Sequence, residues 1–200
     1  MENTKSKKQI LRMVQASMII AIIILMQVTG IGFIMIPFAS FTIMHIPVII
    51  GAIIMGPAWG ALFGGVMGLS ALINATLRGS NPIDLAFSPF YSGNAIGSLI
   101  MSIGVRVLIG LFAGLIFNAL TKRNVNDILS TTIAAFLATL TNTVGVLSCL
   151  WLLFPSLNVT FKAVIKTLFA FNFLVEAVLA ILFSLAFAKV LPAFRKNKKA

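Results

Sequence analysis

Apolar stretches longer than a membrane is thick constrain this sequence more than any other feature. The clearest stretch runs from about Leu11 to about Gly32 and is rich in Ile and Met. A helix needs about 20 apolar residues to cross a hydrocarbon core of roughly 30 Å. Only 10% of the 200 residues are charged and 60% are hydrophobic, which leaves too little polar surface for a water-soluble globule. The sequence therefore predicts an all-α integral membrane protein with a single membrane domain, residues 1–200.

The net charge is +11, and 11 of the 15 basic residues lie in clusters beside the apolar stretches. This placement argues against a nucleic-acid partner, because the basic residues form no stripe or patch of their own and instead flank membrane spans. Lys and Arg mark cytoplasmic segments, so both termini and the loop near residue 122 are expected on the cytoplasmic side. An even number of crossings follows. The clusters are Lys5, Lys7, Lys8 and Arg12, then Lys122 and Arg123, then Lys189, Arg195, Lys196, Lys198 and Lys199.

Six spans satisfy this topology. The second has only 13 residues before Gly56-Pro57 and would be about 20 Å long as a helix, so it must be tilted or partly sunken. Joining it to the third would leave five crossings, which the shared basic character of both ends disfavours. The apolar stretch 33–41 is broken by Pro37 and is expected to be a loop tucked into the protein. The predicted spans are 11–32, 44–56, 58–77, 93–120, 127–154 and 161–191.

Two ionisable residues lie near the middle of predicted spans, where charge is costly and indicates function. They are Arg106 in the fourth span and Glu176 in the sixth, with Asn142 of the fifth near the same depth. Two interpretations stay open. Arg106 and Glu176 neutralise each other as a buried pair, or Arg106 holds the carboxylate of a ligand while Asn142 adds a directed hydrogen bond.

The remaining chemistry is sparse. His45 is the only histidine, expected at the outer end of the second span, as an interfacial residue or as a ligand contact. Cys149 is the only cysteine and permits no internal disulfide. The sequence thus predicts no catalytic residue, no metal site and no cofactor held by this chain. A solute-binding protein is favoured over a membrane-embedded enzyme acting on a lipid or isoprenoid, and over a self-sufficient secondary transporter.

Several motifs resemble the substrate-binding S components of energy-coupling factor vitamin transporters. They are the run from His45 to Gly51, the following Gly56-Pro57, and the glycine-rich third span with Gly60, Gly64 and Gly68. Within that family, Met44-His45-Ile-Pro-Val together with Phe87-Ser88-Pro89-Phe90 is most similar to the pantothenate-specific members. Folate and hydroxymethylpyrimidine remain alternative ligands.

The resemblance implies a vitamin pocket in the outer half of the bundle, capped by the loops 37–44 and 78–92. It also implies a bacterial plasma-membrane location, a transmembrane coupling subunit and two cytoplasmic ATPases as partners. ATP and Mg²⁺ would act in those ATPases, because this chain has no nucleotide-binding motif. Coupling contacts in the family follow an Ala-x-x-x-Ala stripe, represented here by Ser17 and Ala21. The candidate ligand contacts are Arg106, Asn142, His45, Tyr91, Phe90, Asn94 and Glu176.

Overall fold

Long helices that run back and forth form most of the molecule. The computed structural model describes residues 2–36, 39–79, 82–157 and 171–188. The helices are α1 (Glu2–Thr29), α2 (His45–Met55), α3 (Pro57–Arg78), α4 (Pro82–Leu85), α5 (Ala95–Leu99), α6 (Val105–Lys122), α7 (Asp127–Leu153) and α9 (Phe171–Ala188). A π-helical turn, Ile100–Gly104, joins α5 to α6, and a 3-10 turn, Pro155–Leu157, follows α7.

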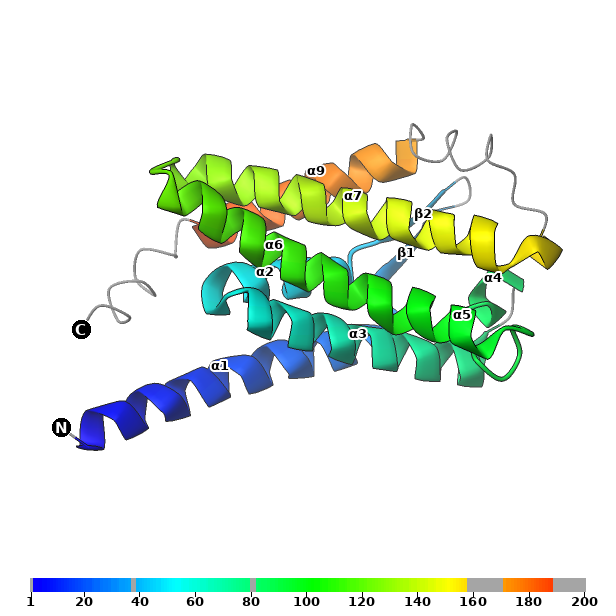
Figure 1. Cartoon of the computed structure of the whole chain (residues 1–200), viewed down its shortest axis with the longest axis horizontal. Coiled ribbons are helices and arrows are strands. Elements are labelled where there is room, and N and C mark those ends of the chain that lie inside the picture. The colour runs from blue at the N-terminus through cyan, green and yellow to red at the C-terminus, as the bar shows by residue number, and fades with distance from the viewer. Residues whose placement is uncertain (1, 37–38, 80–81, 158–170, 189–200) are drawn as a thin grey trace.

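The two ends of the bundle differ in the segments that they carry. The start of α1, the α2–α3 turn, the α6–α7 connection and the end of α9 lie at one end (Figure 1). The connection holds Lys122 and Arg123, and the first turns of α1 are also basic. The end of α7, α4 and the start of α5 lie at the opposite end (Figure 1). The basic segments described by the structure therefore share one end, as their charge predicts, while the basic tail beyond residue 188 lies outside the described residues.

The described helices confirm a multi-pass membrane protein. Four of them are long and apolar enough to cross a membrane, namely Gln9–Thr29, Pro57–Arg78, Ala95–Lys122 and Asp127–Leu153. The apolar helices His45–Met55 and Phe173–Ala186 are shorter. Residues 161–170 and 189–191 of the predicted last span lie outside the described residues, so the number six stays a prediction.

The segment after α1 corrects one prediction within the otherwise helical fold. Instead of a tucked loop, it forms an antiparallel hairpin of β1 (Phe33–Ile36) and β2 (Ala39–Thr42), with Phe33 opposite Thr42. The Ile43 amide donates to the Gly32 carbonyl at 3.0 Å and closes its base. Two paired strands satisfy each other's backbone groups, which a single buried loop does not achieve.

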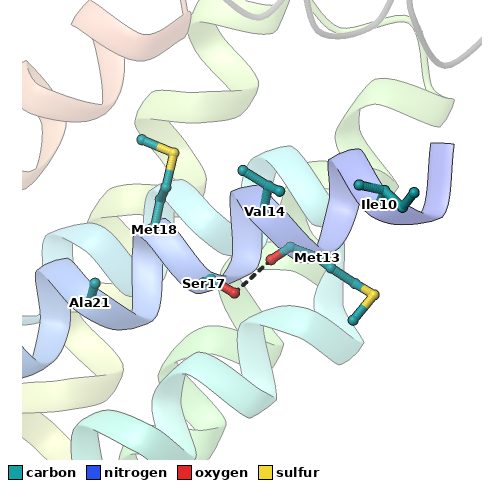
Figure 2. A pocket seen from close by; sticks show the side chains of 6 residues that line it. All are labelled: Ile10, Met13, Val14, Ser17, Met18 and Ala21. Carbon is teal, nitrogen blue, oxygen red and sulfur yellow. Dashed lines mark hydrogen bonds between the residues drawn. The ribbon is translucent and has the colours of Figure 1, made fainter. Parts of the chain in front are cut away.

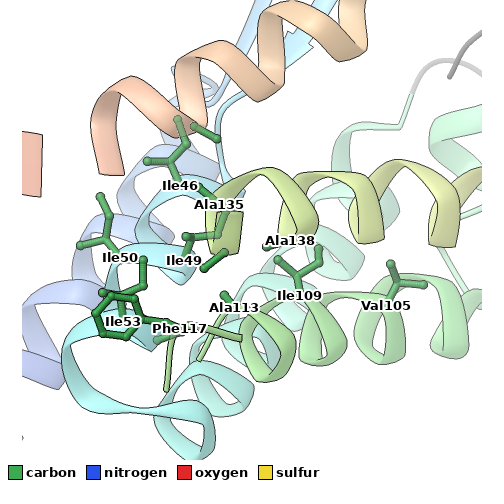
Figure 3. Packing of buried hydrophobic residues seen from close by; sticks show 13 residues of the cluster. Ile46, Ile49, Ile50, Ile53, Val105, Ile109, Ala113, Phe117, Ala135 and Ala138 are labelled. Atoms are coloured by element: carbon green, nitrogen blue, oxygen red, sulfur yellow. The ribbon is translucent and has the colours of Figure 1, made fainter. Parts of the chain in front are cut away.

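The short helix α2 lies in the centre of the bundle. Most of its residues are buried, and it packs against α1, α3, α6, α7 and α9. Its isoleucines meet small residues of α7 and the apolar face of α6 (Figure 3). With 11 residues, α2 is about 17 Å long. This length and burial fit the predicted tilted or partly sunken helix, whose depth in a membrane stays a prediction.

Glycines bring α3 and α6 into backbone contact, as the small-xxx-small spacing predicts. A Cβ atom at Gly60, Gly64 or Gly68 would collide with the carbonyl oxygen of Gly110, Arg106 or Ser102, respectively. The contact therefore determines where the α6 backbone passes at Arg106.

Candidate functional site

Arg106 lies inside the bundle, one residue after the start of α6. Its side chain is 8% exposed, and Nη1 donates to the Met101 carbonyl at 2.8 Å. The guanidinium also lies over the Phe87 ring, 4.8 Å from the ring centroid. No carboxylate pairs with it among the described residues, so a buried cation faces the interior without an anionic partner.

Buried serines of α5 and the π-helical turn hold the segment 86–88 beside Arg106. Ser102 Oγ donates to the Phe87 carbonyl at 2.9 Å, and Ser98 Oγ donates to the Ala86 carbonyl at 2.6 Å. Ser98 and Ser102 are both 0% exposed. These bonds replace water for two carbonyls that membrane burial would otherwise leave unsatisfied.

His45 is the first residue of α2 and is completely buried, at 0% exposure. Its Nε2 lies 3.2 Å from Thr139 Oγ1 of α7. The interfacial interpretation of His45 is therefore wrong. The preceding hairpin returns the chain into the bundle, so α2 begins in the interior and not at its surface.

Asn142 follows Thr139 by one turn of α7 and is 8% exposed. A Cβ atom at Gly145, three residues further on, would lie 2.7 Å from a methyl carbon of Val105. Since Val105 precedes Arg106, the predicted match in depth between Asn142 and Arg106 agrees with the packing of α6 on α7.

Each of these three residues has a buried polar atom without a partner among the described residues. The atoms are Arg106 Nε, Asn142 Oδ1 and His45 Nδ1. An unsatisfied buried group costs about 1–3 kcal/mol, more if it is charged. Such a set, contributed by α6, α7 and α2, suits a ligand that brings a negative charge and several hydrogen-bonding groups.

Glu176 bonds to the backbone of strand β2 and not to Arg106, the partner considered from the sequence. Its Oε1 accepts a hydrogen bond from the Thr42 amide at 2.7 Å, so it ties α9 to strand β2. No ion pair between Arg106 and Glu176 occurs in the described structure, and the paired interpretation is wrong. The hairpin supplies a partner that the sequence did not reveal.

The other three candidates lie near the end of the bundle opposite the basic segments. Phe90 is 78% exposed and Tyr91 is 63% exposed. Asn94 Oδ1 accepts from the Gly97 amide at 2.9 Å and Nδ2 donates to the Leu153 carbonyl at 3.0 Å, so this side chain caps α5 and ties it to α7. The structure brings none of them into contact with Arg106, and their binding role stays a prediction.

Sequence reasoning missed Phe87, Ser102 and Thr139. Phe87 was considered only as part of a motif, since nothing local indicates that its ring covers a cation in α6. Ser98 and Ser102 carried a usable signal, because two hydroxyls at i and i+4 mark one polar strip on an otherwise apolar helix.

A shallow groove of about 540 Å³ follows one face of α1 (Figure 2). Ser17 and Ala21, the predicted partner contacts, lie in it, and Ser17 Oγ donates to the Met13 carbonyl at 2.9 Å. Ala16 and Ile23 on the opposite face are buried against the bundle. The groove is therefore an outward surface, lined by Ile10, Met13, Val14, Ser17, Met18 and Ala21.

Comparison with known proteins supports a transport role. A family model described as the substrate-specific component of ECF transporters matches residues 11–191, which include Arg106, Asn142, His45 and Glu176. A curated relative, the pantothenic acid transporter PanT of Lactococcus lactis subsp. cremoris (strain MG1363), is 34% identical over 163 residues. That alignment covers 78% of this chain and 80% of the relative.

Proposed function

Because this chain belongs to the family of substrate-specific components of ECF transporters, we propose that it captures pantothenate and delivers it to an ATP-driven importer. It is a transport subunit and not an enzyme. The observation that supports this ligand most directly is the set of unsatisfied buried atoms on Arg106, Asn142 and His45.

Pantothenate has the groups that this set requires. Its carboxylate would neutralise the Arg106 guanidinium, whose planar donors suit a carboxylate better than a point charge does. Its hydroxyl and amide N–H groups are donors for the Asn142 oxygen, and His45 Nδ1 can face either a donor or an acceptor according to its tautomer. The name of the Lactococcus relative agrees with this choice.

Direct binding measurements test the proposal. The purified protein should bind pantothenate tightly in a 1:1 ratio by isothermal titration calorimetry and release it chemically unchanged. Folate and hydroxymethylpyrimidine are the comparison ligands. If either one binds more tightly than pantothenate, that compound is the substrate instead. Chemical conversion of the bound compound would indicate an enzyme.

We also propose six membrane spans, with both termini on the cytoplasmic side of the bacterial cell membrane. The four long helices and the two shorter apolar helices provide the segments. The basic first turns of α1 and the basic α6–α7 connection share one end of the bundle (Figure 1), which the positive-inside rule assigns to the cytoplasm.

The groove on α1 is the proposed contact for the transmembrane coupling subunit, which would connect this chain to two cytoplasmic ATPases that consume ATP with Mg²⁺. Ser17 and Ala21 have small side chains, so a helix of the partner can approach the α1 backbone closely. Lipid gives no hydrophobic drive for this association, which makes close packing its main source of affinity.

Ala21→Trp should abolish ATP-dependent uptake in cells that contain the coupling subunit and ATPases, while leaving pantothenate affinity within about twofold. The indole would occupy the groove and prevent close helix packing. Ile22→Trp, on an adjoining exposed face of α1, is the matched control and should retain uptake. Equal uptake by the two variants would place the contact elsewhere.

Asn142→Asp should weaken pantothenate binding by about 10- to 100-fold, because a second carboxylate would compete for Arg106 and repel the ligand, at roughly 1.4 kcal/mol per factor of ten. Calorimetry measures the effect. Asn126→Asp is the control, since Asn126 accepts from the Ile128 amide as the N-cap of α7 and Asp caps a helix equally well. Unchanged affinity in Asn142→Asp would remove Asn142 from the site.

A further inference from the structure

We infer that Phe87 and Ser102 are positioning residues that hold the Arg106 guanidinium in one orientation and thereby determine selectivity for an anionic ligand. This inference rests on the proposed function, because it concerns how the same site distinguishes a carboxylate from a neutral group. Neither residue is among the predicted ligand contacts.

An isolated arginine side chain is a poor anion receptor, because binding must first freeze its many rotamers. Arg106 is restrained before any ligand arrives. One nitrogen, Nη1, is committed to the Met101 carbonyl at 2.8 Å, and Cζ lies 4.8 Å from the centroid of the Phe87 ring. These two contacts restrict where the group can point, and they leave Nε free among the described residues.

The π-helical turn contributes to this restraint. The Val105 amide bonds to the Ile100 carbonyl five residues earlier, and Met101 lies within the same turn. Arg106 reaches back across it by the same five-residue interval to the Met101 carbonyl. Such turns are rare and often occur at functional sites, and here the turn lies directly before the proposed ligand-binding arginine.

Phe87 is itself held by the continuous helical span Ala95–Lys122, which carries Arg106. Ser102 Oγ donates to the Phe87 carbonyl and Ser98 Oγ to the neighbouring Ala86 carbonyl. Ser88 Oγ bonds with Thr76 Oγ1 of α3 at 2.8 Å, which ties the same segment to a third helix. These bonds hold the Phe87 backbone in place, so its ring starts from a fixed position beside the guanidinium.

The physical consequence concerns charge selectivity. The negative face of an aromatic ring stabilises a buried cation, so Phe87 helps to maintain a charged and oriented Arg106 inside the membrane domain. A guanidinium held in one orientation binds a carboxylate more strongly than a hydroxyl, because charge-assisted hydrogen bonds are about twice as strong as neutral ones. Loss of the ring should consequently reduce the preference for an acid more than it reduces general affinity.

The test compares pantothenate with pantothenol, which has a primary alcohol in place of the carboxylate, by calorimetry on the full-length protein. Wild type should prefer the acid, and Phe87→Leu should lower the ratio of the two affinities by about 3- to 30-fold, the range of a desolvated cation–π contact. Ser102→Ala should lower it in the same direction, and Phe87→Tyr should restore it. Phe63→Leu, in the buried cluster between α1 and α3, is the matched control and should leave the ratio unchanged.

Equal weakening of both ligands by Phe87→Leu would overturn the positioning role and leave Phe87 as a packing residue. An unchanged ratio would overturn it as well. A wild-type protein that binds neither compound would overturn the proposed function together with this inference, so the two failures are distinguished by the wild-type measurement alone.

Discussion

Arg106→Ala should weaken pantothenate binding by roughly 100- to 1,000-fold. Removing one partner of a buried charge pair costs about 2–5 kcal/mol, and each 1.4 kcal/mol is a factor of ten. Pantothenol should lose far less, because it carries no charge for the guanidinium to match. Calorimetry with both compounds measures the difference.

The same substitution should leave the ligand-free protein as stable as wild type. Arg106 is buried without a carboxylate partner among the described residues, and an uncompensated buried charge does not stabilise a fold. The thermal midpoint in detergent should thus be retained, while the rise that pantothenate causes in wild type should vanish. Arg78→Ala is the control, since Arg78 is exposed and donates to the Val28 carbonyl, away from the site. A lower midpoint with unchanged affinity would make Arg106 structural.

Gly64→Ala should destabilise the bundle by about 2–3 kcal/mol or more. The new methyl group would overlap the Arg106 carbonyl of α6, and overpacking a tight contact costs about 1–3 kcal/mol even when only side chains must move. Here backbone faces backbone, so α6 must shift as a whole. Because Arg106 moves with it, pantothenate affinity should also fall.

The adjacent glycine provides the control. A Cβ atom at Gly65 would lie 3.7 Å from Val107 Cγ2, an ordinary contact, and Ala is a better helix former than Gly by about 1 kcal/mol. Gly65→Ala should be neutral or slightly stabilising in thermal unfolding. Equal loss of stability in the two variants would show that helix propensity or lipid exposure, and not the α3–α6 contact, decides the outcome.

Much of this molecule follows from its residues alone. Long apolar stretches must be helical in lipid because a helix satisfies its own backbone groups. Four apolar helices lie close to predicted spans, namely Gln9–Thr29, Pro57–Arg78, Ala95–Lys122 and Asp127–Leu153. The four-residue spacing of Gly60, Gly64 and Gly68 is visible in the sequence and is typical of a close helix contact, which the structure shows between α3 and α6. Arg106 and Asn142 could be placed in the interior for the same reason, since polar groups facing lipid are costly.

The tertiary structure determines which of these groups contact each other. The hairpin lies between α1 and α2, and the pairing of its two strands satisfies their backbone groups. It brought the Thr42 amide to Glu176 and placed His45 in the interior. Phe87 lies over Arg106 although 19 positions separate them in the sequence. Local apolar patterns determine helices, whereas contacts between distant segments depend on the shape of the space that the packed helices leave.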